Sequence, residues 1–181
     1  WSSDVCSSDL LHAGLSGILP GLIERFSTIR LKTQRFDALA RDPALIPTLH
    51  AVGKTSLTCG LEGISSRLRR YLHKSLDEND IRRSLGLLFS APMRELKIFL
   101  IATGLEQEED FTEFKDLAEF CAESLRAAGR RPRIVFSLTP LVRFPWTPLE
   151  FEDAFDTGRY APIINRIASI IKSRQFEFRV A

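Results

Sequence analysis

The sequence predicts an α/β fold in which four parallel strands alternate with helices and form part of a barrel. Short strand-like runs cover residues 28–34, 56–62, 96–104 and 134–139, and a helical segment follows each of them. This alternation is typical of parallel βα units. Polar residues alternate with apolar ones along the runs, whereas parallel strands covered on both faces are normally apolar throughout. We therefore expect an open or closed barrel with helices outside and a polar ligand cavity inside.

The predicted inner face supplies a candidate substrate cavity. Its polar side chains are Arg30, Lys32, Gln34, Lys97, Ser137 and Thr139. Four of them are long, and burying such groups without partners is costly. We expect a polar or anionic substrate, although an internal network of these side chains with Glu62 would explain them equally well.

Helices are predicted between the strands. Residues 11–26 have the pattern of the end of one helix, and Asp42 with Pro43 begins the next, since an N-cap followed by proline suits a first helical turn. Ser65 can cap an arginine-rich helix, and a further helix is expected within residues 75–89.

The last third of the chain follows the same scheme. The acidic residues 106–110 favour a helix N-terminus through the helix macrodipole. Apolar residues then recur at helical spacing from Phe111 to Leu125, which indicates a helix facing the core. Residues 161–180 predict a helix followed by a strand-like segment, FEFRV.

The first ten residues, WSSDVCSSDL, resemble the conceptual translation of a common sequencing adapter. We exclude them from the fold prediction, as is usual for segments of non-native origin. A disordered N-terminus rich in serine and aspartate is the alternative. On the adapter interpretation, the chain is expected to be a fragment of a longer protein.

The composition is that of an ordinary globular domain, with 44% hydrophobic and 27% charged residues among 181. The net charge of +2 is too small to indicate nucleic-acid binding by itself. No run approaches the roughly 18 apolar residues of a membrane span, and we expect a soluble, cytoplasmic protein. Cys59 and Cys121 are expected to be buried thiols. The histidines lie too far apart to suggest a local metal site.

Three strand ends are candidate ligand sites, because ligands of parallel α/β folds bind where strands give way to helices. After the second run, glycines allow close approach to the backbone, and Glu62 can accept hydrogen bonds from ribose hydroxyls or an ammonium group. Pairing of Glu62 with a neighbouring Arg or Lys is the structural alternative. Residues 101–104 offer a flat surface to a ring such as adenine. Residues 137–148, with three prolines, predict a rigid loop that either contacts ligand or only lines the rim.

Three segments carry short motifs in a characteristic order: TSLTCGLEGISSRLRRYLHKSLDENDI, ELKIFLIATGLEQEEDF and IVFSLTPLVRFPWTPLEF. The residues that carry the motifs are Glu62, Gly63, Ser65 and Lys74, then Gly104, Leu105 and Glu108, and finally Pro145, Thr147 and Pro148. Together they resemble radical SAM enzymes, particularly the group that often carries an N-terminal cobalamin-binding domain. Glu106 departs from the family, which often has proline there, and this leaves the loop shape open.

The resemblance implies that residues 11–152 form the C-terminal part of a (β/α)6 radical SAM barrel and hold its third to sixth strands. Residues 153–181 would be a C-terminal helix and the start of a following segment. Such enzymes bind a [4Fe-4S] cluster through a CxxxCxxC loop and cleave S-adenosylmethionine (SAM) to a 5′-deoxyadenosyl radical. This sequence lacks that loop. We therefore expect an enzyme when the protein is full length and an inactive fragment here.

The resemblance also implies where SAM binds. The expected contacts are Thr58, Glu62, Ser65, Arg67, Arg69, Ala102 and Gly104. Arg67 or Arg69 would meet the methionine carboxylate, since a guanidinium group suits a carboxylate, while solvated surface charges are the alternative. Ala102 and Gly104 would lie beside the adenine. No catalytic or metal-ligating residue is expected in this chain.

A second function, of another class, stays open at this point. The chain could be a noncatalytic barrel-derived domain that recognises RNA through the basic residues 67–74. In either case a barrel cut before its third strand exposes a pairing edge, so residues 11–181 alone are expected to be poorly soluble or loosely packed.

Overall fold

The computed structural model of this chain describes residues 15–26, 33–51, 53–74, 76–146, 149–151 and 156–180. Its elements, in chain order, are α1 (Leu15–Arg25), β1 (Thr33–Arg35), α2 (Phe36–Arg41), α3 (Leu45–Ala51), β2 (Ser56–Glu62), α4 (Ser66–Tyr71), α5 (Glu78–Ser90), β3 (Glu95–Ala102), α6 (Glu108–Ala127), β4 (Arg133–Pro140), α7 (Thr157–Ser173) and β5 (Glu177–Val180). Among these elements, none of the helices is long and apolar enough to cross a membrane.

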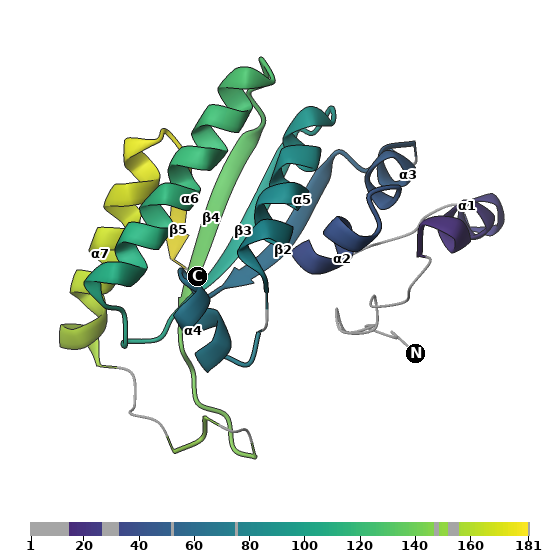
Figure 1. The fold of residues 1–181 in the computed structure, drawn as a ribbon. Helices are drawn as coiled ribbons and strands as arrows, with labels where there is room; N and C mark the ends of the chain where they lie inside the picture. The colour runs from purple at the N-terminus through teal and green to yellow at the C-terminus, as the bar shows by residue number, and fades with distance from the viewer. Residues whose placement is uncertain are drawn as a thin grey trace.

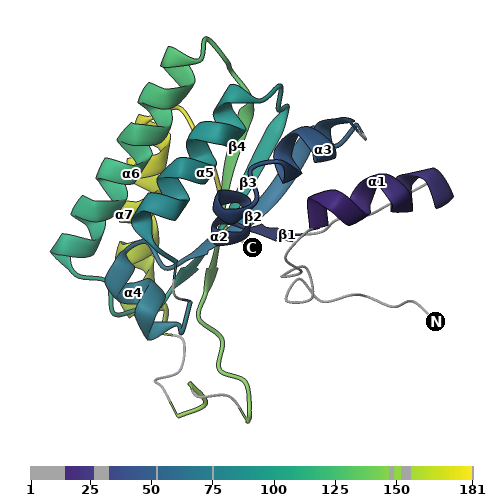
Figure 2. The same cartoon turned by 45° about the vertical axis from the view of Figure 1, so that its right-hand side comes forward.

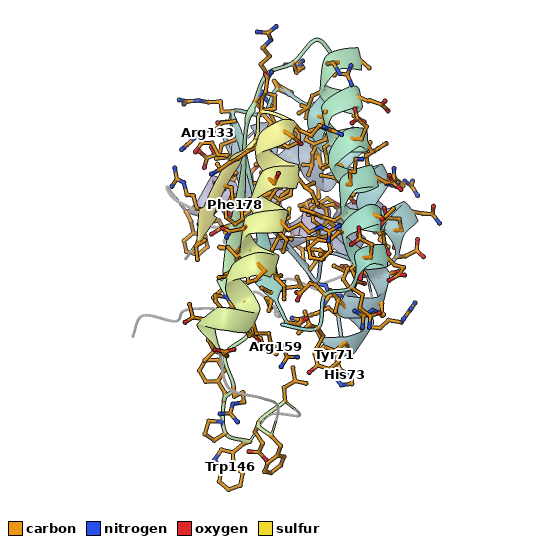
Figure 3. The ribbon with its side chains drawn as sticks, turned by 90° about the vertical axis from the view of Figure 1, so that its left-hand side faces the viewer. Tyr71, His73, Arg133, Trp146, Arg159 and Phe178 are labelled. Carbon is orange, nitrogen blue, oxygen red and sulfur yellow. The ribbon has the colours of Figure 1, made fainter. Side chains whose placement is uncertain are left out.

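Five parallel strands form one sheet in the order β1-β2-β3-β4-β5 (Figure 1). Right-handed crossovers that all advance in one direction place their helices on the same face of a sheet. Accordingly, α2, α5, α6 and α7 cover one face (Figures 1 and 3). Helices α1 and α3 lie at the β1 edge (Figure 2). The predicted α/β class, with parallel strands and helices in alternation, is confirmed.

Most strand positions agree with the sequence prediction. β2 has the predicted bounds, β3 and β4 each begin one residue earlier, and β5 coincides with the strand-like end of the chain. Of the first predicted run, only Thr33 and Gln34 lie within the described residues. Arg30 and Lys32 lie outside them, as do the ten residues that resemble an adapter.

The core lies between the sheet and its helices. The strand residues that face it are Leu57, Cys59, Leu61, Leu96, Ile98, Leu100, Ile134, Phe136 and Leu138, and all are buried. Phe136 meets Phe114 of α6 edge to face, with 5.9 Å between ring centroids. Burial raises the pKa of the Cys59 and Cys121 thiols to about 12, so neither forms a thiolate near neutral pH.

The opposite face of the sheet carries no helix in Figure 3 and is chemically mixed. Strand register places Thr58, Lys97 and Val135 in one row across it, and Gly60, Phe99 and Ser137 in the next. Lys97 and Thr139 are partly exposed, whereas Ser137 is buried. We call this surface the open face.

Gln34 does not belong to the open face, and this corrects the sequence prediction. It pairs in register with Cys59, not with Thr58, and it is buried. Thr33 and Arg35 share the face of Thr58 and Gly60 instead. A shift of one residue moves every side chain of a strand to the other face, and the alternation in the sequence does not set that shift.

Candidate functional site

Glu62, at the carboxyl end of β2, has an unusual backbone. Its φ angle is 68°, and the register between β2 and β3 shifts between Gly60 and Glu62. A left-handed conformation is strained for a residue other than glycine, and such strain concentrates at functional sites. A Cβ on Gly60 would lie 2.5 Å from Glu62 Oε1. The carboxylate therefore lies directly against the backbone of Gly60, and a side chain at position 60 would displace it.

The Glu62 carboxylate is half-buried and makes no hydrogen bond or ion pair with any residue that the structure describes. It lines a small cavity of about 90 Å³ between β1, β2 and the segment after α4. Arg35 and Lys74 line the same cavity. A carboxylate and two cationic groups around one cavity suit a ligand that carries both an ammonium and a carboxylate.

Arg35 is held in place by Asp37. Arg35 Nε donates to Asp37 Oδ1 at 2.8 Å, and Nη2 donates to Oδ2 at 3.1 Å. Burial opposes ionisation of Asp37, but the hydrogen bonds from Arg35, the positive charges of Arg35 and Arg41 and a backbone hydrogen bond from Ala38 together outweigh it, so the pKa of the carboxyl lies below its ordinary value. The pair fixes the guanidinium group at the end of β1, beside the Glu62 cavity. Sequence patterns did not single out Arg35, because its face depends on the register of β1.

Ser65 and Arg67 converge on one buried carboxylate from α6. Ser65 caps α4 by accepting a hydrogen bond from Leu68 N, and its Oγ donates to Asp110 Oδ1 at 2.5 Å. Arg67 binds both Asp110 oxygens, at 3.2 and 2.5 Å, and also donates to the carbonyl of Leu105. The predicted cap at Ser65 is confirmed. Both side chains, however, are engaged by the protein and not free for a ligand.

Arg69 is also engaged by the protein. Its side chain is only 1% exposed and contacts Glu78 of α5 at 3.0 Å and Glu113 of α6 at 3.1 Å. Arg82 shares Glu78. Arg69 thus joins three helices and lacks the exposure that a ligand contact needs, which corrects its expected role at the methionine carboxylate. Of the basic stretch 67–74, both Arg67 and Arg69 are paired, which weakens the case for RNA binding there.

The end of β3 is closed by α7. Tyr160 donates to the carbonyl of Thr103 at 2.9 Å, and Arg159 Nε donates to the carbonyl of Gly104 at 2.7 Å. Gly104 has a φ angle of 78°, and a Cβ there would lie 3.0 Å from the Tyr160 ring. Ala102 is fully buried, so it offers no surface to an adenine ring. The resemblance gave no signal for Arg159 or Tyr160, which lie more than fifty residues further along the chain.

Comparison with family models and with curated proteins identifies no relative of this chain. No family model matches the chain. No curated protein matches it either. Within the described residues, no group of three or more His, Cys, Asp or Glu side chains could hold a metal ion. Functional inference therefore depends on the geometry of the strand ends and on the motifs of the sequence.

Of the predicted substrate residues, Lys97, Ser137 and Thr139 lie on the open face. Lys97 places its Nζ 4.6 Å from the centroid of the Phe99 ring. Ser137 is adjacent to Phe99 in register, and Thr139 lies two residues closer to the carboxyl end of β4. The face thus combines a cation, an aromatic ring and hydroxyl groups, with Lys97 nearest the amino end of the strands and Thr139 nearest the Glu62 end.

The loop after β4 extends beyond the carboxyl end of the sheet, with Trp146 at its tip (Figure 3). Val142, Phe144, Trp146 and Phe151 are all exposed, and Trp146 is 95% exposed. Trp146 N donates to Glu150 Oε2 at 2.8 Å. The loop adds an apolar rim to the same end of the sheet that carries Glu62. Thr147 and Pro148, part of the third motif, lie outside the described residues.

Proposed function

We propose that this chain is part of the barrel of a radical SAM enzyme and that its Glu62 edge binds SAM. The observation that carries the proposal is the Glu62 carboxylate, which is half-buried, has a left-handed backbone and makes no hydrogen bond or ion pair among the described residues. The positive charge of Arg35, on the same cavity, interacts with it electrostatically. Glu62 lies at the carboxyl end of a parallel strand, where ligands of such folds bind. It also belongs to the first of the three motifs that resemble radical SAM enzymes.

The architecture supports this proposal. Sequential parallel strands with helices on one face and polar groups on the other are the arrangement of a barrel wall. A doubly wound sheet would reverse its strand order and carry helices on both faces. We therefore favour β1 to β4 as the third to sixth strands of such a barrel, with β5 as a further parallel strand beside β4.

Each charged group of the Glu62 cavity has a role under this proposal. Glu62 accepts hydrogen bonds from the ammonium group of the methionine part. Arg35 or Lys74 faces its carboxylate, in place of Arg67 and Arg69, whose charges are satisfied within the protein. Thr58 lies on the open face two residues before Gly60 and offers a hydroxyl to the ligand. The [4Fe-4S] cluster, whose ligands this sequence does not carry, would supply the electron that cleaves SAM.

The test uses the protein from the complete reading frame, purified without oxygen. We expect bound iron and sulfide, and formation of 5′-deoxyadenosine from SAM. Glu62→Gln removes the negative charge and should raise the Kd for SAM about tenfold or more, the effect of one strong charge-assisted hydrogen bond. Glu123→Gln makes the same change on the exposed surface of α6 and should leave the Kd within about twofold.

Two results would contradict the proposal. One is a complete protein that binds neither cluster nor SAM. The other is an active enzyme whose SAM affinity is the same in the Glu62→Gln and Glu123→Gln variants, because Glu62 would then have no part in binding. In the first case the noncatalytic binding domain becomes the better interpretation.

A further inference from the structure

A second cleft lies at the other end of the sheet, where β4 and β5 begin. It has a volume of about 790 Å³ and is bounded by the C-terminal ends of α6 and α7 and by the first residues of both strands. Glu62 stands at the opposite, carboxyl end of its parallel strand. The cleft therefore belongs to a separate site and needs an explanation of its own.

The walls of this cleft are strongly basic. Its ionic side chains are Arg126, Arg130, Arg131, Arg133 and Arg174, with Glu119 and Glu177 as the acidic ones. Glu119 pairs with Arg126 and Arg174, and Glu177 pairs with Arg133. Arg130 and Arg131 have no ion pair within the part of the chain that the structure describes. The cleft consequently has an excess of positive charge.

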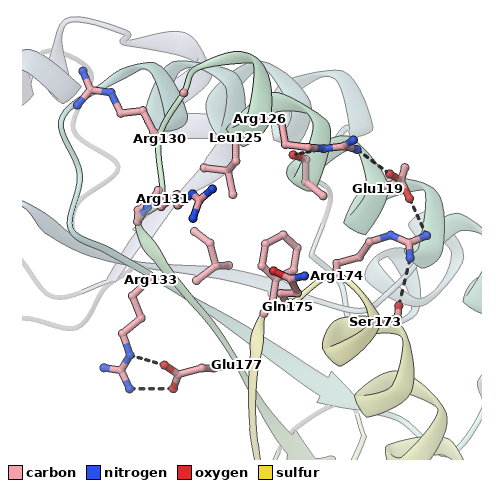
Figure 4. A pocket seen from close by; sticks show the side chains of 15 residues that line it. Glu119, Leu125, Arg126, Arg130, Arg131, Arg133, Ser173, Arg174, Gln175 and Glu177 are labelled. Carbon is pink, nitrogen blue, oxygen red and sulfur yellow. Dashed lines mark hydrogen bonds and ion pairs between the residues drawn. The ribbon is translucent and has the colours of Figure 1, made fainter.

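Two of the arginines have a structural explanation. Arg126 lies in the last turn of α6 and Arg174 is the C-cap residue of α7, where cations interact favourably with the negative end of the helix macrodipole. Arg131 has no such explanation, because it follows the helix in a connecting segment. Figure 4 shows its side chain on the inner wall, near Leu125 and Gln175, whereas Arg130 extends away from the cleft.

Arg174 gives a second, independent observation. Its Nη2 atom binds Glu119 at 2.6 Å, but its Nε is buried and has no hydrogen-bond partner among the described residues. A buried donor without a partner costs free energy. The Arg174 side chain as a whole is 25% exposed and lines the cleft, so an anionic oxygen beside its guanidinium group would offset the positive charges of Arg174 and Arg131.

The remaining lining narrows the ligand class. Leu125, Ile134 and Phe176 form an apolar wall beside the arginines. A volume of about 790 Å³ lies within the range of small-molecule sites, which is roughly 300–1,000 Å³. The planar guanidinium group of arginine can donate two hydrogen bonds to the oxygens of one phosphate group. The aromatic ring of Phe176 can stack on the flat face of a nucleotide base.

We propose that this cleft binds a phosphorylated ligand of nucleotide size, with its phosphates on Arg131 and Arg174 and its apolar part against Phe176. The ligand is bound independently of the Glu62 site. Ligand binding in this cleft does not require SAM. The presence or absence of that binding therefore leaves the function proposed for the Glu62 edge unaffected.

The experiment is a calorimetric titration of the complete protein with ATP, without Mg²⁺ and at low ionic strength. Arg131→Ala should weaken ATP binding about tenfold, as expected for loss of one charge-assisted contact. Arg83→Ala, at an exposed position of α5 outside the cleft, is the matched control and should change it by no more than about twofold. Arg131→Lys, which keeps the charge, should restore part of the loss. Glu62→Gln should have no effect, which separates this site from the one proposed for SAM.

Tripolyphosphate distinguishes the source of the affinity. If tripolyphosphate binds and competes with ATP, the cleft recognises the phosphate groups. If it binds more weakly than ATP does, the apolar wall also contributes to the affinity for ATP. Absence of ATP binding would overturn the proposal. So would equal losses for Arg83→Ala and Arg131→Ala, which would indicate diffuse attraction. Binding of a single-stranded RNA oligonucleotide without binding of ATP would overturn it as well. Unchanged thermal melting of the variants would show that lost binding is not lost folding.

Discussion

Ser65 and Asp110 lie 45 residues apart in the sequence, and the Ser65 hydroxyl donates a 2.5 Å hydrogen bond to the Asp110 carboxylate. The bond ties the N-cap of α4, directly after the Glu62 strand end, to the first turn of α6. Asp110 also accepts from Gln107 N and from Arg67. One buried carboxylate thus fixes two helix starts beside the candidate SAM site.

Asp110→Asn should therefore destabilise the fold. The amide cannot accept from all three partners and brings no charge to Arg67, so we expect a loss of about 1–3 kcal/mol in the free energy of unfolding. Urea denaturation measures this loss in the free energy of unfolding. Asp116→Asn, on the exposed side of the same helix, is the control and should change stability by less than about 0.5 kcal/mol. Equal stabilities of the two variants would show that the carboxylate is not needed.

The same carboxylate predicts a pH dependence. Burial opposes ionisation of Asp110, but hydrogen bonds from Arg67, Ser65 and Gln107 outweigh it and hold the pKa below its ordinary value. The unfolded chain then binds the proton more tightly, so the stabilisation is present above about pH 4 and is lost as the pH falls through the folded-state pKa. Urea midpoints measured from neutral to acid pH should converge for the wild type and Asp110→Asn. Parallel curves would contradict this prediction.

Arg69→Met tests the link between α4, α5 and α6. Methionine fills similar space but leaves Glu78 and Glu113 without their shared cation. Removing one partner of a buried pair commonly costs about 3–5 kcal/mol, and because both glutamates are partly exposed we expect about 2–4 kcal/mol. Arg70→Met, at the exposed neighbouring position, should be nearly neutral. A methionine variant as stable as the wild type would mean that the charges are dispensable.

Gly104→Ala should loosen the contact between the end of β3 and α7. The added Cβ would meet the Tyr160 ring at 3.0 Å and occupy a φ of 78°, so a loss of about 1–2 kcal/mol is expected. Gly86→Ala, within α5, has no atom within 4 Å of its Cβ and should raise stability by up to about 1 kcal/mol through helix propensity. Thermal melts of the two variants should therefore shift in opposite directions; shifts in the same direction would contradict the prediction.

Features that depend on neighbouring residues were predictable from the sequence. The bounds of β2, the alternation of strands with helices apart from α2, the cap at Ser65 and the apolar stripe of α6 all arise from alternation, helical spacing or capping within a few residues. The acidic residues before Phe111 were correctly placed at a helix start, but their partners were not foreseen.

Partners and faces were decided by tertiary structure. Arg67 meets Asp110, and Arg69 meets Glu113, only because α4 packs against α6, and nothing in residues 67–74 indicates a charge more than forty positions away. Gln34 lies on the core face instead of the predicted inner face because pairing with β2 sets the register of β1. The sequence by itself determined the local backbone, since short-range hydrogen bonds and periodicity act within a few residues. The packing of distant segments determined which side chains remain free to bind a ligand.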